Sequence, residues 1–162
     1  MNILSKYFTF VLLLCTLASC SGIYEDGAEM ASDKKSKIQS TSVDSLKKMI
    51  ENGEDLLVLD VRNSSDFFTE NIPGSVLISR GMLEFQIDNP DFWATQYMYP
   101  PEKTGKIIIC SKNGDLGILS ALSLMKLGYK NVYNLEGGYN AYNPNQDPNA
   151  APKKSGGCGG SI

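Results

Sequence analysis

Apolar-rich runs recur along the chain and are separated by polar segments. They occupy residues 56–61, 75–78, 107–110 and 131–135, and such runs are typical of strands buried on both faces of a parallel sheet. Segments predicted to be helical lie before and between them, at 43–50, 64–69, 82–85, 92–94 and 116–127. This alternation predicts an α/β domain with a central parallel sheet flanked by helices.

Small and polar residues predict where these helices begin and end. Ser42 or Asp44 is expected to cap the first helix, and Ser64 and Ser65 are expected to cap the second. Gly128 follows the last long helix, where a glycine in the left-handed conformation commonly ends a helix. The sequence therefore predicts both the number of elements and several of their boundaries.

The first nineteen residues have the pattern of a targeting segment. Lys6 is their only charge, residues 7–14 are almost entirely apolar or aromatic, and small residues precede Cys20. This pattern predicts a secretory signal peptide over residues 1–19. The run Leu-Ala-Ser-Cys also resembles the bacterial lipobox, which implies acylation of Cys20 and export to the cell envelope. The alternative is an ordinary signal peptide that happens to carry a cysteine.

Polar and small residues flank the predicted domain on both sides. Residues 20–38 contain few apolar side chains and are predicted to form a flexible tether. Residues 144–162 are rich in Pro, Lys and Gly and are predicted to form a disordered tail, in which Cys158 lies between glycines. The folded domain is therefore expected over residues 39–143.

Composition excludes several kinds of chemistry. The formal net charge is -3, and no basic stripe indicates a nucleic-acid partner. The chain contains no histidine, which excludes histidine acid–base catalysis, Cys–His dyads and His-ligated metals. No metal or cofactor is therefore expected, and a reactive cysteine must be activated by backbone dipoles and nearby cations.

Cys110 is the candidate nucleophile. It follows three isoleucines at the end of a predicted strand and precedes a short polar loop that opens into a helix. A thiol at a helix N-terminus has its thiolate favoured, and the thiolate is the reactive form. The alternative is an inert buried cysteine at a strand end, because free cysteine is among the most buried residue types.

Five separate blocks resemble the single-domain rhodanese family over residues 42–142. The resemblance implies a small α/β domain with a parallel sheet, in which Cys110 attacks a sulfane sulfur and becomes a persulfide. The sulfur would then pass to a thiol or another acceptor, so a small sulfur donor and a thiol acceptor are the expected partners. The blocks are Leu-Val-Leu-Asp-Val-Arg at 57–62, Asp-Phe at 66–67, Ile-Pro-Gly-Ser at 72–75, the strand ending at Cys110, and the run from 127 to 138.

The loop after Cys110 departs from the family pattern Cys-x-x-Gly-x-Arg. Counting forward from Cys110 puts the arginine position on Asp115. Counting backward from Leu-Gly-Tyr at 127–129 puts it on Leu116, with a loop one residue longer than usual. In either case the cation is missing, so an anionic donor would bind less well. The predicted active-site loop comprises Ser111, Lys112, Asn113, Gly114, Asp115 and Leu116.

Asp60 and Arg62 are predicted to support this loop. The resemblance places them beneath it, and an Asp–Arg pair at a strand end usually holds loops through charge-assisted hydrogen bonds. The Gly-His that usually precedes Ile-Pro-Gly in the family is Glu70-Asn71 in this chain.

Three functions remain open from the sequence. The first is a membrane-anchored sulfurtransferase or persulfide carrier using Cys110, and the second is a catalytically weak or inactive rhodanese-like binding module. The third is a cysteine phosphatase or arsenate reductase, which would need an arginine where Leu116 stands. If Cys15 leaves with the signal peptide and Cys20 is acylated, Cys110 and Cys158 remain as thiols, and Cys158 is a candidate to resolve an oxidised or persulfidated Cys110.

Overall fold

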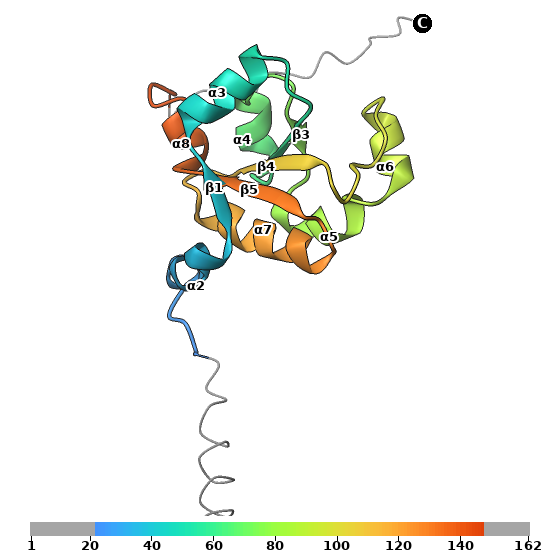
Figure 1. The fold of residues 1–162 in the computed structure, drawn as a ribbon. Helices are drawn as coiled ribbons and strands as arrows, with labels where there is room; N and C mark the ends of the chain where they lie inside the picture. Colours follow the sequence, from blue (N-terminus) through green and yellow to red (C-terminus); the bar gives the residue numbers. More distant parts are fainter. Residues whose placement is uncertain (1–21, 148–162) are drawn as a thin grey trace, which may run out of the picture.

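The computed structural model describes residues 22–147 as a five-stranded parallel sheet covered by helices on both faces (Figure 1). The predicted signal peptide, Cys20, Cys158 and the tail from residue 148 onward lie outside the described residues. The strand order is β1-β5-β4-β2-β3, and all strand pairs are parallel. The strands are β1 (Gln39–Thr41), β2 (Leu57–Asp60), β3 (Val76–Leu77), β4 (Lys106–Cys110) and β5 (Asn131–Leu135). The predicted fold class is confirmed.

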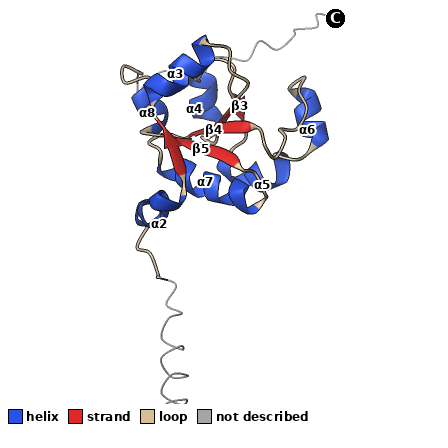
Figure 2. Ribbon diagram, viewed as in Figure 1, coloured by secondary structure: helices blue, strands red, loops and turns tan. Residues whose placement is uncertain are grey.

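Two layers of helices enclose the sheet (Figure 2). One face is covered by α2 (Gly27–Lys34), α5 (Leu83–Gln86), α6 (Pro90–Thr95) and α7 (Asp115–Lys126), and the other by α3 (Val43–Glu51), α4 (Ser64–Thr69) and α8 (Gly138–Tyr142). Two short 3-10 helices, η2 (Lys35–Lys37) and η3 (Arg80–Met82), join these elements. The strand β4 supplies side chains alternately to the two faces, so Ile107 and Ile109 enter one core cluster and Ile108 and Cys110 enter the other.

Two of the three helix ends predicted from the sequence are confirmed, those of α3 and α7. Ser42 caps α3 by accepting a hydrogen bond from the backbone N–H of Ser45, and Gly128 ends α7 with φ of 91°. The cap predicted for α4 is wrong, because Asn63 rather than Ser64 or Ser65 accepts the hydrogen bond from Asp66 N–H. Asparagine is among the best N-cap residues, so it competes with the serines for that place.

The expectation of a flexible tether is wrong for the part of residues 20–38 that forms α2 and η2. Asp26 caps α2 by accepting from the Glu29 N–H, and Ala31 is fully buried in the core beside α7. The sequence contains no indication of this helix, because a single alanine is the only one of its side chains that is buried. Where α2 and α7 lie close together, the methyl group of Ala31 is large enough to fill the space between them. Among the described residues, no helix is long and apolar enough to cross a membrane.

Candidate active site and its relatives

The candidate site lies at the carboxyl ends of the central strands, where α/β sheets place their ligands. Cys110 is the last residue of β4 and pairs in register with Asp60, the last residue of β2. The segment 111–114 then links β4 to α7. The structure therefore brings together Cys110, the predicted loop and the two predicted support residues.

Asp60 and Arg62 form a buried ion pair that is fully occupied by internal contacts. The Asp60 carboxylate accepts from the Arg62 Nη2 at 2.8 Å, from its Nε at 3.0 and 3.1 Å, and from its backbone N–H at 2.9 Å. Arg62 Nη2 also donates to the Glu70 carbonyl at 2.7 Å, and the guanidinium lies 4.0 Å from the centre of the Tyr139 ring. This pair ties β2 to α4 and α8.

Cys110 is fully buried, and its environment opposes ionisation. Its side chain belongs to the core cluster on the α3, α4 and α8 face, with neighbours that include Ile72, Leu135 and Tyr139. Burial, with a smaller contribution from the negative charge of Asp60, raises the pKa of the Cys110 thiol to about 12, although the Arg62 charge acts in the opposite direction. The Cys110 Sγ lies 3.7 Å from the Ser111 carbonyl, to which the protonated thiol donates.

The expectation of a thiolate at a helix N-terminus is therefore wrong for Cys110. The helix α7 begins only at Asp115, and Cys110 belongs to the strand rather than to the loop before the helix. Whether Cys110 carries sulfur stays a prediction, but its thiol is held protonated at neutral pH.

Ser111, rather than Cys110, is the residue whose side chain enters the loop. Its Oγ accepts from the backbone N–H of Gly114 at 3.0 Å, and its carbonyl accepts from the Tyr139 N–H at 2.7 Å. The next carbonyl, of Lys112, accepts from the Asn140 N–H at 3.0 Å. The loop is thus fastened to α8 by its backbone, while the Ser111 hydroxyl lies inside it and is fully buried.

Gly114 is the residue of the loop that must be glycine. Its φ is 99°, which residues with a side chain rarely adopt, and a Cβ there would lie 3.2 Å from the backbone nitrogen of Gly137. Beside it, Asn113 Nδ2 donates to the Asp115 carboxylate at 2.8 Å, and Leu116 is 39% exposed at the start of α7. The predicted loop residues therefore lie together, although they perform different local tasks.

The amide of Asn134 fills the space between this loop and the first turn of α7. A Cβ on Gly117 would lie 2.1 Å from Asn134 Oδ1 and 3.4 Å from Ser111 Oγ, so glycine at 117 makes room for the amide. Asn134 is 3% exposed, and its Oδ1 has no hydrogen-bond partner in the described part of the chain. The sequence analysis missed this contact, and glycine within an otherwise apolar helical pattern was the signal that could have revealed it.

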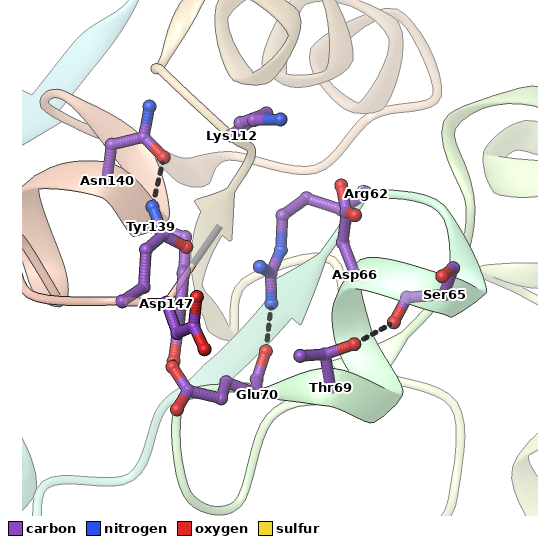
Figure 3. Close-up of a pocket in the computed structure, with 10 residues that line it drawn as sticks. Arg62, Ser65, Asp66, Thr69, Glu70, Lys112, Tyr139, Asn140 and Asp147 are labelled. Carbon is purple, nitrogen blue, oxygen red and sulfur yellow. Dashed lines mark hydrogen bonds between the residues drawn. The ribbon is translucent and has the colours of Figure 1, made fainter. Parts of the chain in front are cut away.

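A cavity of about 390 Å³ opens beside the buried ion pair, between α4 and the start of α8 (Figure 3). Arg62 and Lys112 bring positive charge to its lining, and Asp66, Glu70 and Asp147 bring negative charge. Asp60 already balances the charge of Arg62. The side chains that line the cavity therefore carry more negative than positive charge. Cys110 and Ser111 are not among the described residues that line the cavity.

Comparison with known proteins decides the family. The sequence profile described as "Rhodanese-like domain" matches residues 42–145. The chain belongs to the rhodanese-like family. Bacillus subtilis strain 168 has a relative described as "Putative sulfur carrier protein YrkF", 27% identical over 109 residues, which are 67% of this chain and 53% of the relative. This chain therefore spans about half the length of that relative.

Solved structures share this rhodanese-like fold. The human single-domain sulfurtransferase TSTD1 has a TM-score of 0.61 at 22% identity, over 67% of this chain and 97% of that protein. A Rhodopseudomonas palustris CGA009 protein, RPA3614, has a TM-score of 0.62 at 26% identity, over 76% of this chain and 93% of its own. That structure is described as a protein of unknown function and possible tyrosine phosphatase.

The glycine of the loop sets the register of the rhodanese pattern on this chain. In Cys-x-x-Gly-x-Arg, Gly114 as the fixed glycine places the cysteine position on Ser111 and the arginine position on Leu116. The backward count from residues 127–129 gives the same arginine position. On this register the loop has the usual length, so the expected extra residue is not needed, and Cys110 lies one residue before the nucleophile position.

Proposed function

We propose that this protein is a rhodanese-like binding module whose loop does not carry sulfur. The observation that supports this proposal best is Ser111 in the cysteine position, with its hydroxyl bonded to the Gly114 N–H inside the loop. A hydroxyl oxygen cannot form a persulfide. With no histidine in the chain, no imidazole activates that hydroxyl as a nucleophile either.

Two further features favour binding over sulfur transfer. Leu116 occupies the arginine position and is partly exposed, so the loop lacks the cation that would receive an anionic donor. The neighbouring cavity adds the carboxylates of Asp66 and Glu70, which repel anions such as thiosulfate. The same Leu116 argues against a cysteine phosphatase or arsenate reductase, which needs an arginine at that place.

A sulfur carrier that uses Cys110 is the second candidate. It is favoured by the description of the Bacillus subtilis relative as a putative sulfur carrier and by the short distance in the fold between Cys110 and the Asp60–Arg62 pair. This function requires the core around Cys110 to open, because the thiol is fully buried and its pKa is raised. A resolving role for Cys158 would require the same opening.

A gain-of-function experiment tests the proposal. The full chain with Ser111→Cys and Leu116→Arg should transfer sulfur from thiosulfate to a thiol or to cyanide, whereas the unaltered chain should not. The matched control adds Cys110→Ser to both proteins and should leave both results unchanged. Transfer by the unaltered chain that disappears with Cys110→Ser would replace this proposal with the sulfur-carrier function.

We also propose that the module is exported and held in the bacterial envelope by lipid on Cys20. The lipobox-like Leu-Ala-Ser-Cys at residues 17–20 and the apolar segment before it support this location. Cys20→Ser should leave an unprocessed precursor without lipid, which intact-mass measurement and detergent partitioning would detect. A Cys20→Ser chain that is still lipid-modified would contradict the anchor.

A further inference from the structure

The helix α7 is apolar on all sides although it lies at the surface of the domain. Between Asp115 and Lys126 its sequence contains no charged residue. Ile118 is buried against the sheet, whereas Leu116 and Met125 are 39% and 43% exposed. A helix that is apolar all round is normally covered on all sides. The exposed side of α7 has few polar groups, and its partly exposed Ser123 accepts a hydrogen bond from Arg80, which also pairs with Glu84.

The elements beside α7 extend this apolar surface. In the described chain, the layer of α2, η3, α5 and α7 exposes most of the large apolar side chains that lie on helices, with Phe85 the most exposed at 76%. The opposite layer of α3, α4 and α8 exposes Ile50 and Phe68 among its large apolar residues. We call the exposed large apolar side chains of these elements, Met30, Met82, Phe85, Leu116 and Met125, the apolar face.

The helix α2 fixes where the lipid-bearing end of the chain joins the domain. Ala31 is buried against the core of the α7 layer, and α2 begins at Gly27. Only residues 21–26 separate this helix from Cys20, and that length of chain reaches at most roughly 25 Å when fully extended. A domain attached so closely remains next to the lipid headgroups, with the α2–α7 layer nearest to the attachment.

We propose that the apolar face rests on the surface of the membrane to which Cys20 is anchored. Phe85 and Met82 enter the boundary between headgroups and acyl chains. The cavity between α4 and α8, on the opposite layer, then faces away from the bilayer and stays accessible to a partner. This inference rests on the proposed lipid anchor.

Tryptophan quenching by brominated lipids tests this orientation on the acylated full chain reconstituted in vesicles. The one native tryptophan, Trp93, is fully buried and should not be quenched. Phe85→Trp adds an indole to the apolar face, and Phe68→Trp adds one to α4 at a position that is 46% exposed. We expect strong quenching in the Phe85→Trp chain and almost none in the Phe68→Trp and unaltered chains.

The outcomes separate this inference from the anchor on which it rests. If the protein is acylated and sediments with the vesicles but Phe85→Trp is not quenched, or Phe68→Trp is quenched equally, the orientation is wrong while the anchor stands. That result would indicate that the apolar face binds another protein instead of the membrane. If the purified chain carries no lipid and does not sediment with vesicles, both the anchor and the orientation are overturned.

Discussion

The two parts of the rhodanese-like site differ in how completely they follow the family. In the support part, Asp60 and Arg62 are buried, and their charged groups are matched by each other and by the Glu70 carbonyl. In the loop part, serine occupies the cysteine position, leucine occupies the arginine position, and a buried amide oxygen of Asn134 has no described partner.

This difference indicates that the Asp60–Arg62 ion pair stabilises the fold, whereas the side chains of the loop decide whether the site can react. The support part joins β2, α4 and α8, so its loss would damage the fold whether or not sulfur is transferred. The loop is held to α8 by backbone hydrogen bonds, which do not depend on the side chain at 111. The side chains at positions 111 and 116 can therefore be replaced without changing the backbone conformation of the loop.

Breaking the support part should have the largest effect. Arg62→Met removes one partner of a buried ion pair and leaves the Asp60 carboxylate without its counter-charge. The expected loss is about 3–5 kcal/mol of the free energy of unfolding, measured by urea denaturation. The matched control is Arg80→Met, which breaks a partly exposed pair with Glu84 and should cost about 0–1 kcal/mol. Equal losses in both variants would contradict the structural role of Arg62.

Filling the space inside the loop should have an intermediate effect. Gly117→Ala places a methyl group against the Asn134 amide and should cost about 1–3 kcal/mol, although alanine is otherwise the better helix former. The cost should shrink when Asn134→Ala is made in the same chain, which a double-mutant cycle measures. Gly81→Ala is the control, since nothing lies within 4 Å of a Cβ at that position. A cost that is independent of Asn134 would show that the amide does not occupy this space.

The fold could be predicted because its central strands are continuous apolar runs. The residues of β2 and β4 are recognisable by that pattern alone, and Ser42 and Gly128 mark helix ends by their own conformational preferences. The strand β1 and the helix α2 were missed, because an edge strand of Gln, Ser and Thr and a helix buried through one alanine have no apolar pattern.

The site was harder to predict because a shift of one residue exchanges the two faces of a strand. Cys110 points into the α3, α4 and α8 layer, while Ser111, one residue further, places its hydroxyl under the loop at the start of α7. From the sequence, the nucleophile is assigned to Cys110 because a thiol is the more reactive of the two neighbouring side chains. The backward count from residues 127–129 already pointed to this register, and the positive φ of Gly114 supports it.

The buried thiol should give the smallest effect, as a dependence of stability on alkaline pH. The folded protein holds the Cys110 proton to a pKa of about 12, whereas an unfolded cysteine loses it near pH 9. Folding therefore gains from the protonated thiol below pH 9, and this gain falls by about 1.4 kcal/mol per pH unit above it. Between pH 9 and 10, below the range where tyrosines ionise, Cys110→Ser should show a shallower decline of the unfolding free energy. Identical slopes would contradict a protonated, buried Cys110.

The central claim is that the folded domain does not take up transferable sulfur as a persulfide. Intact-mass measurement tests this claim most directly. The full chain with Cys158→Ser is exposed to a polysulfide donor under native conditions and then measured without reductant. If the proposed processing removes Cys15 and acylates Cys20, Cys110 is the one remaining thiol of this chain. The account predicts an unchanged mass, and one added sulfur once Ser111→Cys is introduced. One added sulfur in the parent chain, mapped to Cys110 by peptide analysis, would contradict it.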